Sequence, residues 1–250
     1  MTDALLDDLA PQLALNRTYW LGWNGGSGDP DADLPVYRTG IPHALLNGVA
    51  RVRGLPIKEA IEEAHERLAG TRWIWWVGAD SDPGTAEALE AHGATAAGSV
   101  PIMARDLTAL PGVPTVDGLT IGEPGDLHDY VRGYAAPNGL PEDALDLVTE
   151  REAGYRPPRG TLVRLAGRMD GRTVSTTSVL IDGDVAGLFC VATLAAYQRR
   201  GIASALTAVA LRTARDAGAR VITLQASSQG EPVYQRAGFR TVGDYRFFRF

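Results

Sequence analysis

The sequence has only one cysteine among its 250 residues, Cys190. A single cysteine excludes an internal disulfide and a metal site built from several cysteines. In the apolar run GLFCVAT it is interpreted as a small buried side chain. The chain also has no run of about 18 apolar residues, the length needed to span a membrane. Its start, MTDALLDDLA, is acidic where a secretory signal needs basic residues. These absences predict a soluble, cytoplasmic protein.

Positive charge is also scarce: 24 lysines and arginines face 30 aspartates and glutamates, a formal net charge of −6. Because general nucleic-acid binders are usually basic, that class is disfavoured. An acidic surface is compatible with a cationic or amine-bearing substrate. The four histidines are His43, His65, His92 and His128. They show no His-x-x-x-His spacing and no acidic clustering, so we expect no metal site.

The second half of the chain has a regular order of predicted elements. A short strand at Leu119 precedes two helices, which are separated by a break at Pro137–Gly139. Three strand-like runs over residues 161–193 are joined by Asp-Gly turns, which is typical of hairpins. A helix, a strand, a short helix and a final strand then follow over residues 201–250. One β-α-β crossover is therefore expected.

The first half repeats the end of this order more weakly. A helix, an aromatic strand, a short helix and a strand are predicted between Leu55 and Leu107. Repetition of this kind favours two related units. The boundary is expected in the proline- and glycine-rich stretch Leu110–Gly118, giving units 1–115 and 116–250. Trp73, Trp75 and Trp76 occupy both faces of the aromatic strand, which favours core packing over substrate stacking.

The stretch YQRRGIASAL, residues 197–206, predicts a phosphate site. Two arginines and a glycine precede a helix whose first turn carries small residues. A helix N-terminus exposes unpaired N–H groups and partial positive charge, and a glycine there admits a ligand close to the backbone. Together with the forked donors of the arginines, these features fit a pyrophosphate. Neither a Walker loop nor a dinucleotide fingerprint is present. An ordinary basic turn is the alternative.

The same stretch resembles the Gln/Arg-x-x-Gly-x-Gly/Ala motif of the GNAT N-acetyltransferase superfamily. The resemblance extends over residues 119–250 and includes the downstream Tyr-x-x-x-Gly-Phe. It implies an α/β fold of two GNAT-like units, each with a mixed, mostly antiparallel sheet flanked by helices. It also implies that a splayed strand and the loop bind acetyl-CoA. The binding residues it implies are Val191, Thr193, Arg199, Arg200, Gly201, Ile202, Ala203, Ser204 and Ser227. Ser227 stands where relatives often carry asparagine.

The first unit looks like a degenerate GNAT unit. Its first predicted helix follows ARVRGLP instead of the phosphate-binding motif, and Pro56 removes one backbone donor. We therefore expect this unit not to bind CoA. Completing the substrate cleft and serving only as a scaffold are both open interpretations of its role.

Tyr234 matches the tyrosine that acts as general acid in many relatives; without the motif it would be interpreted as a packing residue. A backbone N–H near Val191 is expected to polarise the thioester carbonyl. The general base is not evident, and His43, Glu123 and Glu231 are candidates.

The resemblance implies an acetyl-CoA-dependent N-acetyltransferase that acts on a primary amine of a small molecule or peptide by direct attack. A non-catalytic acyl-CoA-binding or regulatory module is the alternative. The sequence identifies neither the acceptor, nor the oligomeric state, nor the length of the acyl group.

Overall fold

The computed structural model describes residues 2–250, with side chains from residue 5 onward. The strands of the first half are β1 (Val36–Arg38), β2 (Asn47–Val49), β3 (Ile74–Val77) and β4 (Thr95–Asp106). Those of the second half are β5 (Thr120–Gly122), β6 (Thr161–Met169), β7 (Arg172–Asp182), β8 (Val185–Thr193), β9 (Val221–Gln225) and β10 (Arg240–Arg249). All ten join in one sheet, in the order β1-β2-β3-β10-β4-β9-β8-β7-β6-β5.

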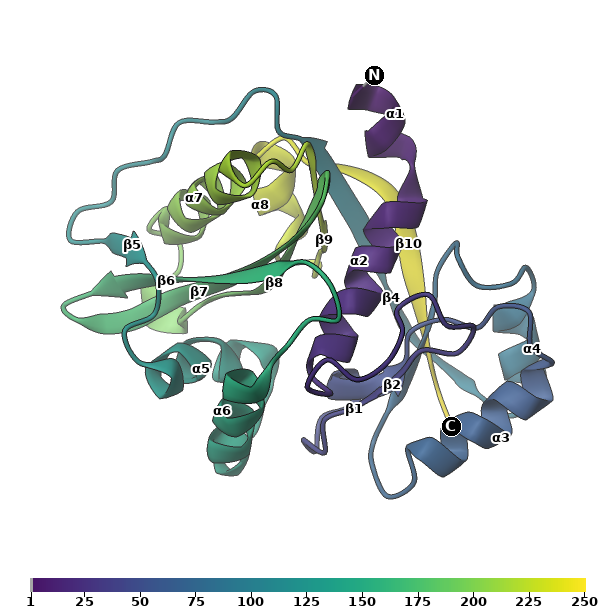
Figure 1. Cartoon of the computed structure of the whole chain (residues 1–250). Helices are drawn as coiled ribbons and strands as arrows, with labels where there is room; N and C mark the ends of the chain where they lie inside the picture. The colour runs from purple at the N-terminus through teal and green to yellow at the C-terminus, as the bar shows by residue number, and fades with distance from the viewer. Residues whose placement is uncertain (1) are drawn as a thin grey trace.

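The α-helices are α1 (Thr2–Asp7), α2 (Leu9–Gly22), α3 (Ile57–Arg67), α4 (Thr85–Ala91), α5 (Leu127–Ala135), α6 (Leu145–Gly154), α7 (Ile202–Asp216) and α8 (Glu231–Arg236). Single turns of 3-10 helix cover Ala44–Leu46, Ala136–Asn138, Glu142–Ala144 and Ala195–Tyr197. In the second half, α7 and α8 cover one face of the sheet and α5 and α6 the other (Figure 1). The element order predicted for residues 55–250 is confirmed; α1, α2, β1 and β2 are additional.

The two halves of the chain exchange their last strands. β4 follows α4 in the first half but pairs with β9 of the second half, from Ile102↔Gln225 to Asp106↔Val221. β10 follows α8 in the second half but pairs with β3, from Arg246↔Val77 to Phe248↔Trp75. β4 and β10 also pair with each other over most of their length (Figure 1). Neither half therefore completes its sheet alone.

Parallel pairing occurs at matching places in the two halves. β8 pairs parallel with β9 across α7, which confirms the predicted β-α-β crossover. β2 pairs parallel with β3 across α3. The other strand pairs are antiparallel.

Helix α2 lies where the two halves meet (Figure 1). Its Leu13 and Leu21 pack with Trp76 and Tyr245, in the core of the first half. Its Leu15 and Tyr19 instead pack in the cluster that α5 and β8 share. Apolar contacts on several sides bury this helix and fix it against both halves. No helix among the described residues is long and apolar enough to cross a membrane.

Candidate active site

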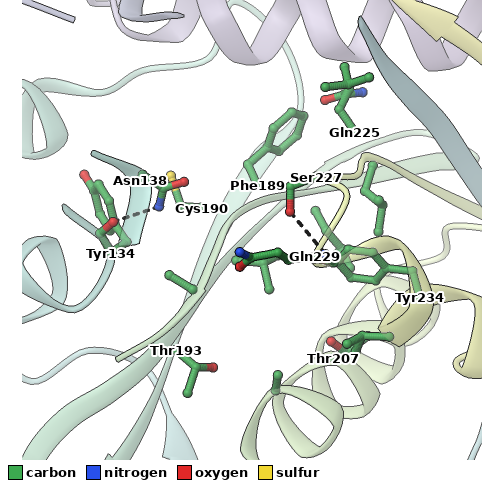
Figure 2. A pocket seen from close by; sticks show the side chains of 18 of the residues that line it. Tyr134, Asn138, Phe189, Cys190, Thr193, Thr207, Gln225, Ser227, Gln229 and Tyr234 are labelled. Carbon is green, nitrogen blue, oxygen red and sulfur yellow. Dashed lines mark hydrogen bonds between the residues drawn. The ribbon is translucent and has the colours of Figure 1, made fainter. Parts of the chain in front are cut away.

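The site opens where two parallel strands separate. The pairing of β8 with β9 ends at Gly187↔Thr223, although both strands continue beyond that point. A cavity of about 920 Å³ begins there. Side chains from β8, α7 and α8 surround it, as Phe189, Thr207 and Tyr234 illustrate (Figure 2). The separation agrees with the splayed strand that the resemblance implied.

A β-bulge in β8 shapes one wall of this cavity. Thr176 pairs with Ala192 and Ser178 with Phe189, so that Cys190 and Val191 together face Thr177. Cys190 adopts a positive φ of 50°. The hydroxyls of Ser175 and Thr176 donate to the carbonyls of Ala192 and Cys190, at 2.7 and 2.9 Å. These bonds fix the bulged backbone, and bulges of this kind redirect side chains next to sites.

The predicted phosphate loop lines the same cavity. Gly201 is the N-cap of α7, with φ 81° and ψ −3°. A Cβ placed there would meet only Val116, at 3.6 Å, so the backbone on this side is open. Arg199 also has a positive φ of 63°. The Gln198 side chain donates to the Thr193 carbonyl at 3.1 Å and ties the loop to the end of β8.

Most residues expected to bind the cofactor meet in this one cavity. Those that line it are Val191, Thr193, Arg199, Gly201, Ile202, Ala203, Ser204 and Ser227. Arg200 is not among the lining residues; its guanidinium lies 5.5 Å from the ring centre of Tyr197. The Ser227 hydroxyl accepts a hydrogen bond from the Gly230 N–H at 3.2 Å.

Tyr234 lies on α8 and lines the same cavity, with 8% of its surface exposed. Its ring packs edge-on against Phe239, with 5.6 Å between the centroids. Its hydroxyl has no hydrogen-bond partner among the described residues. Burial raises the pKa of this phenol above its ordinary value, so Tyr234 keeps its proton at neutral pH.

The first half contributes a wall of the cavity that the motifs did not indicate. His43, Leu45 and Leu46, on and beside the 3-10 turn Ala44–Leu46, line it, together with aromatic residues of α2 and β3. The Nδ1 atom of His43 is buried without a hydrogen-bond partner among the described residues. A Cβ at Gly139 would lie 3.9 Å from His43 Nε2, so this histidine reaches the predicted loop at Pro137–Gly139.

Of the three candidate bases, His43 alone lines the cavity; Glu123 and Glu231 do not. Partial burial lowers the pKa of His43 below its ordinary value, since less water remains to solvate the imidazolium. The corresponding helix start of the first half, at Pro56 before α3, also lies outside the cavity.

A buried carboxylate lies behind the cavity wall. Glu152 is 2% exposed and accepts hydrogen bonds from the Tyr134 hydroxyl, at 2.7 Å, and from Arg164 Nε, at 2.6 Å. The Cys190 thiol lies 3.1 Å from the Tyr19 hydroxyl. Burial and the Glu152 charge raise the pKa of Cys190 to about 12. This thiol is therefore neutral at physiological pH and a poor nucleophile.

Among the described residues, no group of three or more histidine, cysteine, aspartate or glutamate side chains is placed to hold a metal ion.

Comparison with known proteins identifies the fold. The family model of the acetyltransferase (GNAT) domain matches residues 157–249. A GCN5-related N-acetyltransferase from Kribbella flavida is similar over 94% of each chain, with 20% identity and a TM-score of 0.68. A tandem GNAT protein from the clavulanic acid biosynthesis pathway aligns over 86% of this chain and 77% of its own, with 15% identity and a TM-score of 0.59. A search of curated proteins finds no match.

Residues 157–249 therefore carry an acetyltransferase (GNAT) domain, and the two halves of the chain together have the fold of a tandem GNAT protein. The resemblance inferred from residues 198–203 is thereby confirmed, and so is the fold class. Proteins of this superfamily are acetyltransferases that generally use acetyl-CoA and act on amines.

Proposed function

We propose that the protein is an acetyl-CoA-dependent N-acetyltransferase that acetylates a primary amine of a small molecule or peptide by direct attack. The observation that carries the proposal is the single cavity in which the α7 phosphate loop, the splayed β8, Tyr234 and His43 meet. We propose that unit 1–115 does not bind CoA and that unit 116–250 is the catalytic unit.

The residues present fit acetyl-CoA. The open backbone at Gly201, the α7 N-terminus and the Arg199 guanidinium suit a pyrophosphate. Val191 and Thr193 on the splayed β8, with Ser227 opposite, suit the pantetheine arm. Arg200 is proposed as a weaker contact at the rim because it does not line the cavity. When bound, acetyl-CoA supplies an activated acetyl group.

His43 is proposed as the general base. Among the described side chains, no aspartate or glutamate lines the cavity, and burial holds the pKa values of Tyr134, Tyr234 and Cys190 above their ordinary values. Among these residues and His43, only the imidazole is neutral and basic near pH 7. It accepts a proton from the amine directly or through one water.

Tyr234 is proposed as the general acid that gives its proton to the departing thiolate. Its raised pKa keeps the phenol protonated until the thiolate forms, which is the state that a proton donor needs. The neutral thiol of Cys190 supports direct attack by the amine over an acyl-enzyme at that residue.

The test is release of free CoA thiol over a panel of amines, with mass spectrometry of the acceptor. Amine-dependent thiol release with acetylated amine as product is expected. Tight CoA binding, measured by calorimetry, without thiol release from any amine would instead support a non-catalytic acyl-CoA-binding module.

A further inference from the structure

The part of the cavity where the two halves meet is aromatic. Six rings line it, four from the first half and two from the second: Tyr19, Trp20, Trp23, Trp76, Phe189 and Phe247. They are held in fixed positions by contacts with one another and with the core. The Tyr19 and Phe189 rings stack at 3.6 Å, and Trp76 meets Phe247 edge-on at 4.7 Å. Trp20 is the least buried of the six and stacks on Tyr37 at 5.2 Å.

The rim of this aromatic wall is apolar as well. Leu45 lines the cavity although 36% of its surface is exposed. Among the described residues, only Phe250 is another large apolar side chain exposed to this degree. Exposed apolar residues at a cavity mouth are typical of surfaces that bind apolar groups.

The charged side chains that line the cavity are of one sign. The protein carries a formal net charge of −6, yet no carboxylate of residues 5–250 lines this cavity. Its charged lining residues, Arg199 and Arg236, are both cationic. A second ammonium group on the acceptor would lose its water here and find no carboxylate in return. A polyamine or an aminoglycoside therefore fits this cavity poorly.

A few polar atoms remain to orient a single amine. Asn138 donates from its side-chain nitrogen to the Tyr134 carbonyl at 2.7 Å (Figure 2). This bond fixes the amide and leaves Asn138 Oδ1, which has no protein donor among the described residues, as an acceptor on the cavity lining. His43 lines the same cavity, from the first half. A small number of convergent polar groups within an apolar pocket is typical of a site for one orientable small molecule.

We propose that the acceptor is a monoamine whose non-reacting part is aromatic, and that the aromatic wall and Leu45 select it. This inference rests on the proposed function, since it names the acceptor of the same site. The net charge is compatible with an amine-bearing substrate, but the acidic surface does not extend into the cavity, so we infer that selection is by apolar contact.

The test compares three amines: 2-phenylethylamine, pentylamine and 1,5-diaminopentane. Thiol release should give a kcat/KM for 2-phenylethylamine at least about tenfold above that for the diamine, with pentylamine between them. Both monoamines avoid burying a second charge, and only the phenyl ring makes aromatic contacts with the wall beyond the burial of apolar area. Calorimetric binding of each amine to the CoA-saturated protein should follow the same order. Equal or better use of the diamine would overturn the proposal.

The substitution Leu45→Glu tests the wall itself, because it places a carboxylate at an exposed position where the fold tolerates charge. It should lower the preference for 2-phenylethylamine over the diamine about tenfold or more and leave CoA affinity and the melting temperature unchanged. Leu45→Met, which keeps the apolar rim, is the matched control and should keep the preference. An unchanged preference in Leu45→Glu would show that this wall does not contact the acceptor.

Two further outcomes separate this inference from the proposed function. If no amine gives thiol release but 2-phenylethylamine still binds more tightly than the diamine, the proposed catalysis is refuted and the assignment of the pocket stands. A higher kcat/KM with octanoyl-CoA than with acetyl-CoA would show that the aromatic wall holds an acyl chain, and would overturn the acceptor assignment while keeping acyl transfer.

Discussion

Substituting alanine for Gly201 tests the phosphate loop, and the chain supplies a matched control. Gly201 precedes α7 with φ 81° and ψ −3°, and Gly84 precedes α4 with φ 82° and ψ 3°. A Cβ at Gly84 would meet nothing within 4 Å, and at Gly201 only Val116 at an ordinary contact distance. The two sites therefore impose the same backbone cost on alanine.

That shared cost is about 1–2 kcal/mol for an L-residue in the left-handed region. Gly201→Ala and Gly84→Ala should thus both lower the melting temperature, by about 2–8 °C for a chain of this size. Only at Gly201 does the new methyl also stand where the backbone would approach a pyrophosphate. Losing one charge-assisted hydrogen bond costs about 1.5–3 kcal/mol, so Kd for CoA should rise about 10- to 150-fold.

Calorimetric titration of CoA into both variants, with thermal melting alongside, measures the two effects separately. Gly84→Ala should bind CoA as wild type does. If Gly201→Ala binds CoA within about twofold of Gly84→Ala, the α7 N-terminus is not the phosphate site.

Four further predictions rest on the same geometry. Tyr234→Phe should keep CoA affinity and lower turnover about 10²–10⁴-fold; turnover within twofold of wild type, with normal melting, would remove the phenol from the mechanism. His43 has a lowered pKa and is neutral at pH 7, so kcat should fall as the pH drops through a value below 6.5. His43→Gln should lower kcat and abolish this fall at acid pH; an unchanged pH profile would show that another group causes it. Arg199→Ala should weaken CoA binding by about 1–3 kcal/mol, and Arg200→Ala by less, because only Arg199 lines the cavity; equal losses in titration would contradict this. The fragment 119–250 should remain unfolded by circular dichroism, since it lacks β3 and β4; a folded, active fragment would show that the exchange is dispensable.

The second half of the fold could be predicted from sequence because its elements carry local signals. The hairpin turns between β6, β7 and β8 contain Asp-Gly pairs, and α7 has one apolar face between clear end signals. Helix α2 has no such face, because it packs against two core clusters at once and its apolar residues point in several directions. Its periodicity therefore gave no indication of a helix.

The strand exchange could not be predicted for a different reason. Alternation along β4 and β10 indicates which side chains share a face of the sheet, but it says nothing about which strand lies alongside. Both strands follow a short helix and end a similar run of elements, so pairing within each half and exchange between halves fit the sequence equally well. The neighbours are settled by long-range contacts such as Phe248 in the core of the first half.

The proposed cofactor end of the site could be predicted from sequence because its residues are contiguous: the loop at 198–204 is one motif. The proposed acceptor end is assembled from Trp20 on α2, His43 on a loop, Trp76 on β3 and Phe189 on β8. No local pattern connects these residues, and only the joining of the two halves brings them together. His43 was one of three candidate bases on sequence grounds, and its place in the cavity is what favours it.

The most direct test of the central claim is the stoichiometry and affinity of acetyl-CoA binding to the intact chain by calorimetric titration. One site per chain is predicted, because among the described helices only α7 begins with a left-handed glycine next to the cavity, whereas α3 begins after Pro56 outside it. That single site should be weakened by Gly201→Ala and unaffected by Gly84→Ala. No binding would contradict the assignment of the cavity to acetyl-CoA, and two sites per chain would contradict the proposal that the first unit is CoA-free.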